Sequence, residues 1–91
     1  MNNDIKNMIN EMNELYSINY LNVENEINYI INNNIISNKT IEKVFDELLD
    51  LSYWYGKEID KLFYKLYNYY SSINLDVSQD YKNYYKKILR K

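Results

Sequence analysis

Four carboxylates at helical spacing are the side chains best placed for general acid–base chemistry, namely Glu42, Asp46, Glu47 and Asp50. A catalytic carboxylate pair needs a concave, partly dry site that separates the two pKa values, and nothing around these residues predicts one. The chain also lacks Cys and His, which excludes thiolate metal sites, Cys nucleophiles and most hydrolase triads and zinc sites. We therefore expect a solvated acidic face and a non-enzymatic protein with no catalytic residues, metal or cofactor.

Aromatic and cationic side chains of residues 53–67 are better suited to recognising a partner. Tyrosine and tryptophan offer large, rigid contact areas and are enriched in binding hot spots. Beside the single Trp, lysines recur at helical spacing and form a cationic row that suits an acidic partner. We predict a partner-binding surface that consists of Tyr53, Trp54, Lys57, Lys61, Tyr64 and Tyr67. In the competing interpretation, the tyrosines pack against a second helix and the lysines form a solvated face.

The basic C-terminal segment offers an alternative ligand. Residues 80–91 carry a net charge of +4, with five bases against one acid. Such a face can contact phosphates while tyrosines stack on bases. Tyrosines and lysines fall on opposite faces here, so we favour an amphipathic helix with Tyr81, Tyr84 and Tyr85 toward the core. The residues of the alternative nucleic-acid site are Lys82, Lys86, Lys87, Arg90 and Lys91.

Overall charge and composition narrow the class of protein. The formal net charge of −2 is too weak for a DNA mimic and has the wrong sign for a general nucleic-acid binder. Asn, Ile, Tyr and Lys supply 50 of the 91 residues, whereas Ala, Gly, Pro and Arg together supply two. This bias indicates an AT-rich genome. No transmembrane span or signal peptide is predicted, so we expect a cytoplasmic protein, in the host cell if a phage encodes it.

Helical spacing of apolar residues dominates the chain and predicts an all-α protein. In the longest segment a series of mostly apolar residues falls on one side of a helix at about 100° per residue; we call this series the stripe. The stripe crosses Gly56 without a change of phase. Because a hairpin normally needs several turn residues, we predict one helix over about 40–72, about 50 Å long at 1.5 Å per residue. The stripe consists of Ile41, Val44, Phe45, Leu48, Leu51, Ser52, Tyr55, Ile59, Leu62, Phe63, Leu66, Tyr69, Tyr70 and Ile73.

Shorter helical patterns flank this segment. Residues 4–33 form one helix or two, and we favour a break near 17–22 with Asn22 as the second N-cap. Asn32–Asn34 suit a helix end, and Ser37–Thr40 suit the next start. A last helix is predicted over about 77–90, with Asp76 as its N-cap and Gln79 completing a capping box.

Together these patterns predict one helical domain over 1–91: a small bundle of three to four helices with a long central helix and a short C-terminal one. The leading hypothesis is a non-enzymatic protein-binding module that occludes its partner, such as a phage- or plasmid-encoded inhibitor of a host enzyme or defence complex. The alternatives are nucleic-acid binding by the C-terminal helix, an immunity protein or antitoxin, and a self-associating structural protein.

Overall fold

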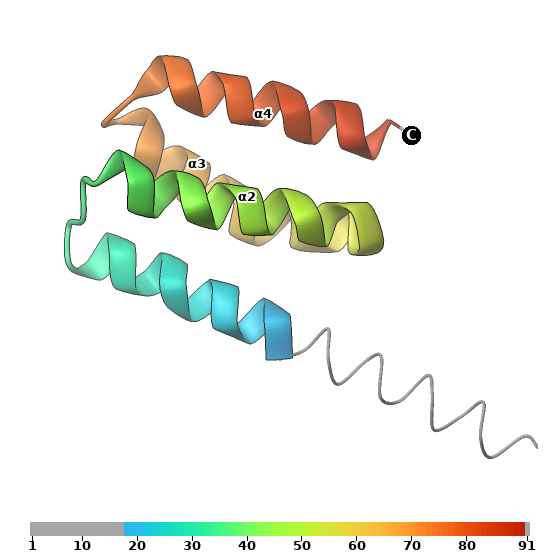
Figure 1. Cartoon of the computed structure of the whole chain (residues 1–91), viewed down its shortest axis with the longest axis horizontal. Coiled ribbons are helices and arrows are strands. Elements are labelled where there is room, and N and C mark those ends of the chain that lie inside the picture. The colour runs from blue at the N-terminus through green and yellow to red at the C-terminus, as the bar shows by residue number, and fades with distance from the viewer. Residues whose placement is uncertain (1–17, 91) are drawn as a thin grey trace, which may run out of the picture.

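The computed structural model describes residues 18–90, and every regular element in this range is helical. The described part of the N-terminal helix spans 18–32. It is followed by α2 (Asn38–Tyr55), a 3-10 turn (Gly56–Ile59), α3 (Asp60–Ser71) and α4 (Leu75–Leu89). Successive helices run in alternating directions (Figure 1). The predicted all-α bundle is confirmed, and the C-terminal helix lies within two residues of its predicted bounds.

The N-terminal helix is continuous over 18–32. The break expected near 17–22 is therefore wrong for residues 18–22, and Asn22 lies inside the helix rather than at its cap. The part of the predicted helical segment 4–33 that precedes residue 18 lies outside the described residues. The helix ends as predicted among three asparagines: Asn34 adopts φ 51°, and the Ile35 N–H donates to the Ile30 carbonyl oxygen at 3.0 Å. This is the geometry of a Schellman C-cap, for which asparagine substitutes for glycine.

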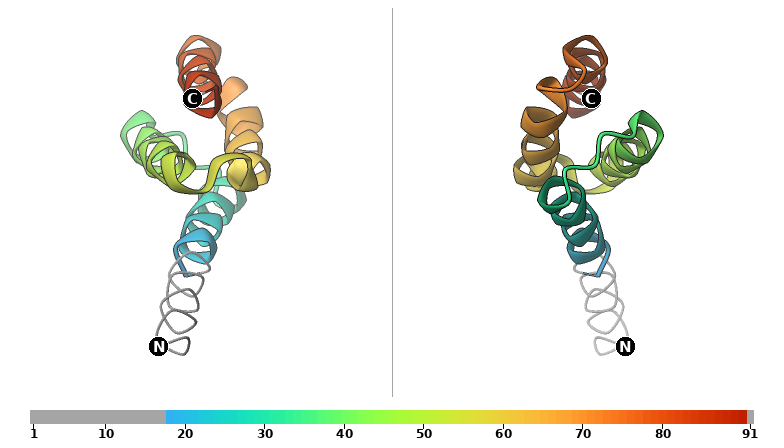
Figure 2. Two further views of the ribbon diagram at one scale, coloured as in Figure 1. Left: turned by 90° about the vertical axis from the view of Figure 1, so that its right-hand side faces the viewer. Right: turned by 90° about the vertical axis from the view of Figure 1, so that its left-hand side faces the viewer.

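All 34 residues from Asn38 to Ser71 are helical, as the stripe predicts, but they do not form one straight rod. In a straight helix Phe45 and Phe63 would lie about 27 Å apart at 1.5 Å per residue. Their ring centroids are 5.5 Å apart instead, because α3 folds back beside α2 (Figure 2). The predicted helical segment is therefore present, but it does not extend over the expected length of about 50 Å, because the chain reverses at Gly56.

A single glycine makes this reversal. Gly56 caps α2 with φ 61° and ψ −134°, and its N–H donates to the Ser52 carbonyl oxygen. An L-residue rarely adopts such a conformation, and a Cβ at this position would meet no atom within 4 Å. Glycine is therefore needed for its backbone conformation and not for space. One turn of 3-10 helix, Gly56–Ile59, then completes the hairpin, so the reversal is made by helical residues and needs no separate loop.

The other helix starts carry side-chain caps. The cap of α2 is Ser37, within the predicted start Ser37–Thr40, and its Oγ accepts from the Thr40 N–H at 3.3 Å. The cap of α4 is Asn74, whose Oδ1 accepts from the Val77 N–H at 3.3 Å. The prediction of Asp76 as the cap is wrong by two residues, because Asn74 and Asp76 are both good caps and sequence spacing does not choose between them.

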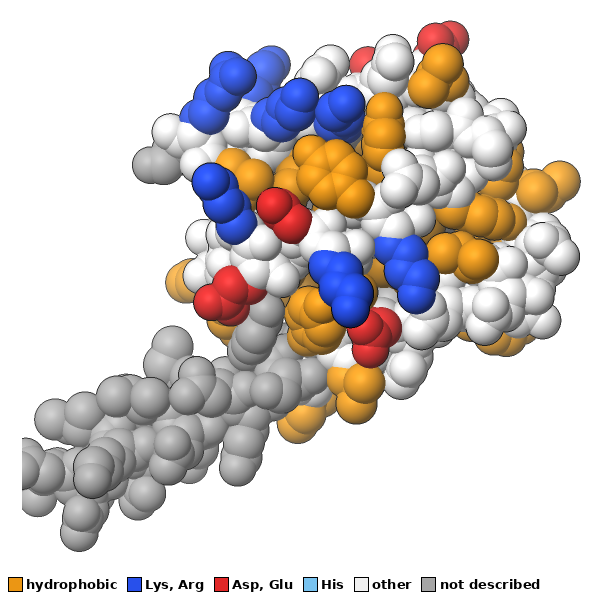
Figure 3. Space-filling model, turned by 180° about the vertical axis from the view of Figure 1, so that it is seen from behind, with side chains coloured by type: hydrophobic (Ala, Val, Ile, Leu, Met, Phe, Trp, Pro, Cys, Tyr) orange, Lys and Arg blue, Asp and Glu red, His pale blue; other side chains and the backbone are white. Residues whose placement is uncertain are grey.

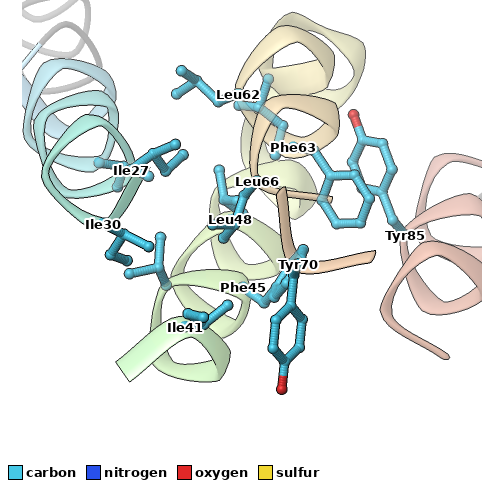
Figure 4. Close-up of a cluster of buried hydrophobic side chains, with 13 residues drawn as sticks. Ile27, Ile30, Ile41, Phe45, Leu48, Leu62, Phe63, Leu66, Tyr70 and Tyr85 are labelled. Carbon is cyan, nitrogen blue, oxygen red and sulfur yellow. The ribbon is translucent and has the colours of Figure 1, made fainter. Parts of the chain in front are cut away.

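The hairpin is the centre of the hydrophobic core. The N-terminal helix and α4 pack on opposite sides of it (Figures 1 and 2). Ile27 and Ile30 of the N-terminal helix point toward the hairpin, and Tyr85 of α4 lies beside Phe63 (Figure 4). The fully or almost fully buried apolar residues are Val23, Ile27, Ile30, Ile41, Val44, Phe45, Leu48, Ile59, Leu62, Phe63, Leu66, Tyr70 and Tyr85. Most of these belong to the stripe, which confirms its inward orientation.

Candidate partner-binding surface

Two residues of the predicted surface, Tyr64 and Tyr67, lie in the packing between α3 and α4. Their rings are 6.0 Å apart at 81°, and the Tyr64 ring meets Tyr85 edge-on at 6.3 Å. The Lys82 ammonium lies 5.2 Å from the centroid of the Tyr67 ring. Both tyrosines are half-buried against the core. The competing interpretation, a second packing face, therefore describes this pair better than a partner-binding surface does.

Two tyrosines of α4, one turn apart, hold the two arms of the hairpin. Tyr81 stacks on Phe45 of α2 at 4.6 Å and 10°, and Tyr85 stacks on Phe63 of α3 at 4.2 Å and 14°. Burial, reinforced by the charge of Asp46, raises the pKa of Tyr81 to about 12. Burial also raises the pKa of Tyr85, whose hydroxyl donates to Asp60. Both phenols therefore stay neutral at physiological pH and act as packing groups.

The remaining aromatic pair, Tyr53 and Trp54, is uncovered at the last turn of α2. The side chains are 62% and 84% exposed. At about 100° per residue, Trp54 lies on the side of α2 opposite the buried Ser52, and Tyr53 lies between the two. Tryptophan normally buries most of its surface and finds a partner for its N–H. An almost fully exposed Trp is thus the most unusual apolar group among the described residues.

Trp54 borders an open hollow between the N-terminal helix and the C-terminal half of α2. The hollow has a volume of about 590 Å³. Val23, Leu51 and Tyr55 supply its apolar walls, and the carboxylates of Glu26, Glu47 and Asp50 supply its charge; Asn19, Asn22 and Trp54 complete the lining. Among the described residues that line it, three are acids and none is a lysine or arginine. The surface beside Trp54 is therefore acidic.

Glu47 is the most perturbed carboxyl of the described residues. Partial burial, together with the hydrogen bond to Glu26 and the charge of Glu26, raises its pKa to about 7. Near neutral pH the Glu47 carboxyl is protonated for part of the time, which tolerates its close approach to Glu26. Above that pH Glu47 is ionised, and the hollow gains negative charge.

The lysines of the predicted surface lie away from this hollow. Lys57 is in the 3-10 turn and Lys61 is in the first turn of α3, and both are exposed. Lys65, one turn further, donates to Asn28 of the N-terminal helix. The lysines and Trp54 were placed together because a straight helix would align them. The reversal at Gly56 leaves Lys57 in the turn and Lys61 on α3, so the structure does not assemble the six predicted residues into one surface.

The alternative site at the C-terminus keeps part of its expected geometry. Lys86, Lys87 and Arg90 are exposed, and cationic side chains gather over the C-terminal half of α4 (Figure 3). Lys82 instead covers Tyr67, and Lys91 lies outside the described residues. Tyr84 is 61% exposed rather than directed to the core, and the Lys87 ammonium lies 5.9 Å from its ring centroid.

Sequence reasoning missed the acidic hollow. Glu26 and Glu47 are 21 positions apart and come from different helices, so only the packing of those helices brings them together. The available signal was Glu47 itself, since it directly precedes the buried Leu48 and occupies the edge of the stripe. Glu42, Asp46, Glu47 and Asp50 do not act as one solvated face: Glu47 and Asp50 line the hollow, whereas Glu42 and Asp46 line another hollow beside α4.

The described residues provide neither a metal-binding group nor a membrane-spanning helix. Among residues 18–90, no group of three Asp, Glu, His or Cys side chains is arranged to hold a metal ion. No helix within the same range has the length and apolar character needed to span a membrane.

Comparisons with known proteins add no assignment. The chain matches no protein-family model, no curated protein and no solved structure.

Proposed function

We propose that this chain is a non-enzymatic protein-binding module that acts by covering a functional surface of its partner. The observation that carries the proposal is Trp54, which is 84% exposed at the border of an open hollow. Burying a large apolar side chain on binding contributes about 1.5–3 kcal/mol, and exposed tryptophans at the centre of a contact are typical hot spots. Tyr53 extends the same surface.

The charge around Trp54 indicates the chemistry of the partner. Glu26, Glu47 and Asp50 line the hollow, and none of the other described residues that line it is cationic. Complementary charge steers association and selects the partner, and an Arg or Lys side chain can also bind over an indole ring. We therefore infer a basic partner surface. This reverses the acidic partner expected from the sequence, because the described residues that line the hollow with Trp54 include three acids and neither Lys57 nor Lys61.

The composition fits a protein that covers a surface of its partner rather than one that catalyses a reaction. The sequence lacks His and Cys, and it has a single Gly, so it offers neither the usual nucleophile–base pairs nor a glycine-rich phosphate loop. An inhibitor of a host enzyme or defence complex, encoded by a phage or plasmid of an AT-rich host, is compatible with this mode of action.

Affinity capture with matched variants tests the proposal. The intact chain is used as bait in lysate of the source organism or its host, with nuclease and a salt step. We expect one protein in near-stoichiometric amount and a loss of more than about tenfold in affinity, or 1.4 kcal/mol, for Trp54→Ala. Tyr84→Ala removes a comparably exposed aromatic from α4 and is expected to bind normally.

Two outcomes of the same experiment would contradict the proposal. Equal binding by the wild type and Trp54→Ala, with helicity unchanged in both, would exclude the Trp54 surface. Nucleic acid released by salt, in the absence of a protein partner, would instead move the function to Tyr84 and the basic end of α4. In that case Lys86→Glu with Arg90→Glu would abolish binding.

A further inference from the structure

The two arms of the hairpin repeat each other at an interval of 18 residues. Residues 41–49 read IEKVFDELL and residues 59–67 read IDKLFYKLY. Eighteen residues are five turns at about 3.6 residues per turn, so paired positions fall at the same angle of one continuous helix. The buried pairs are Ile41 and Ile59, Val44 and Leu62, Phe45 and Phe63, Leu48 and Leu66, and Ser52 and Tyr70.

This register means that the segment has two regular forms. Folded at Gly56, the two stripes face each other within one chain. Straightened, they form a single unbroken apolar stripe along residues 38–71. A straight form needs no change of side-chain orientation within either arm, and only the backbone of the turn has to change. From this equivalence we propose that the chain also forms a domain-swapped dimer, in which Gly56 straightens and the α3–α4 unit of each copy packs on the N-terminal helix and α2 of the other.

The caps of the helices agree with this proposal. Ser37 and Asn74 cap α2 and α4 with their side chains, and these positions are helix starts in both forms. The start of α3 differs, because Ile59 precedes it and makes no side-chain cap. A straight helix would supply the backbone acceptors that this start lacks. The 3-10 turn is therefore the only helix junction of residues 38–90 without a side-chain cap.

The contacts that hold the hairpin closed can all be remade between two copies. Tyr70 donates to Asn38 at 2.9 Å, and Tyr69 donates to the Ile35 carbonyl oxygen at 2.7 Å. Phe45 packs on Phe63. Each of these joins a residue before Gly56 to one after it. The Phe63–Tyr85 stacking lies wholly within the α3–α4 unit and moves with it. A short hinge and a complete set of exchangeable contacts are what a closed, two-fold swapped dimer requires.

The substitution Gly56→Ala tests the balance between the folded hairpin and the straight, swapped form. Alanine favours the straight helix and disfavours the positive φ of the turn, so we expect it to lower the dimer dissociation constant at least about 100-fold, measured by light scattering of the intact chain across a concentration series. Lys57→Ala is the matched control in the same turn and is expected to behave as the wild type. Inserting Asn-Gly-Gly after Gly56 lengthens the hinge and breaks the 18-residue register, which should leave a monomer at all concentrations.

A cross-link identifies the exchange itself. Asn28→Asp keeps an acceptor for Lys65, so a carbodiimide can join the two side chains. In a swapped dimer this bond connects two chains and gives a covalent dimer on a denaturing gel, whereas a dimer of closed hairpins gives only internal bonds. Covalent dimer that grows with concentration supports the proposal.

Other outcomes would overturn it. A Gly56→Ala chain that stays folded and monomeric, or a dimer containing only internal cross-links, would show that the hairpin does not exchange. If Gly56→Ala fails to fold, the Asn28→Asp chain decides alone: internal cross-links at every concentration would reject the swapped dimer.

Discussion

The aromatic residues outside the stripe have opposite environments on the two arms, although the sequences of the arms are alike. Tyr64 and Tyr67 of α3 are covered by α4 and contact Tyr85 and Lys82. Tyr53 and Trp54 of α2 lie beyond the reach of α4 and stay exposed. The difference teaches that an aromatic excess on a helix is not itself a sign of binding. What distinguishes the two sets is whether a neighbouring helix covers them.

The covered set depends on Tyr85, which gives the largest expected change in stability. Tyr85→Ala removes a buried ring that stacks on Phe63, and large-to-small changes of buried aromatics cost about 3–5 kcal/mol of unfolding free energy. Urea unfolding followed by circular dichroism measures it. Tyr85→Phe retains the ring and loses only the bond to Asp60, so it should cost about 1–2 kcal/mol. Equal losses for both variants would show that the hydroxyl, and not the ring, holds α4.

The hollow beside the uncovered Trp54 contains Glu47, whose contribution to the unfolding free energy is smaller and depends on pH. Its pKa is raised to about 7 from 4.5, so the folded chain binds more protons than the unfolded chain between these values. The stabilisation is complete below the unfolded pKa and is lost as the pH rises through the folded pKa. Glu47→Gln should flatten this decline and stabilise the fold at pH 8 by about 1 kcal/mol, less than the full shift implies because the group is partly exposed. Thermal unfolding at a series of pH values measures this effect.

A second variant is the control for the pH dependence that we assign to Glu47. Glu58→Gln removes an exposed carboxylate from the 3-10 turn and should leave the slope of stability against pH unchanged. A wild-type chain whose stability does not fall between pH 5 and 8 would mean that Glu26 and Glu47 do not approach each other in solution.

The smallest expected effect on stability belongs to Trp54. Trp54→Ala removes a side chain that is 84% exposed, and alanine is the better helix former. The unfolding free energy should therefore change by less than about 0.5 kcal/mol, as measured by urea unfolding followed by circular dichroism. A loss of several kcal/mol would place Trp54 in the core and remove the contrast between the two aromatic sets.

Much of the fold was accessible to sequence reasoning. The stripe identified the buried face of residues 41–70 almost residue by residue, and Ser37 and the three asparagines marked helix ends correctly. The candidate site was less accessible. Of its six predicted residues, Tyr53 and Trp54 share an exposed surface, Tyr64 and Tyr67 are packed under α4, and Lys57 and Lys61 lie on the opposite side of the reversal. A helical period specifies the angle of a residue around its own axis, and it contains no information on which neighbour will cover that angle.

The sequence by itself determined the helical class, the inward face of residues 41–70 and the absence of thiol and imidazole chemistry. These follow from composition and from a period of about 3.6 residues, both of which are local properties. Only the tertiary structure decided that the central segment turns back at Gly56, that α4 covers one aromatic set and leaves the other exposed, and that Glu26 meets Glu47. The 18-residue register explains the division, because a straight helix and a folded hairpin bury the same residues. The choice between them depends on contacts such as Phe45 with Phe63, which no local pattern contains.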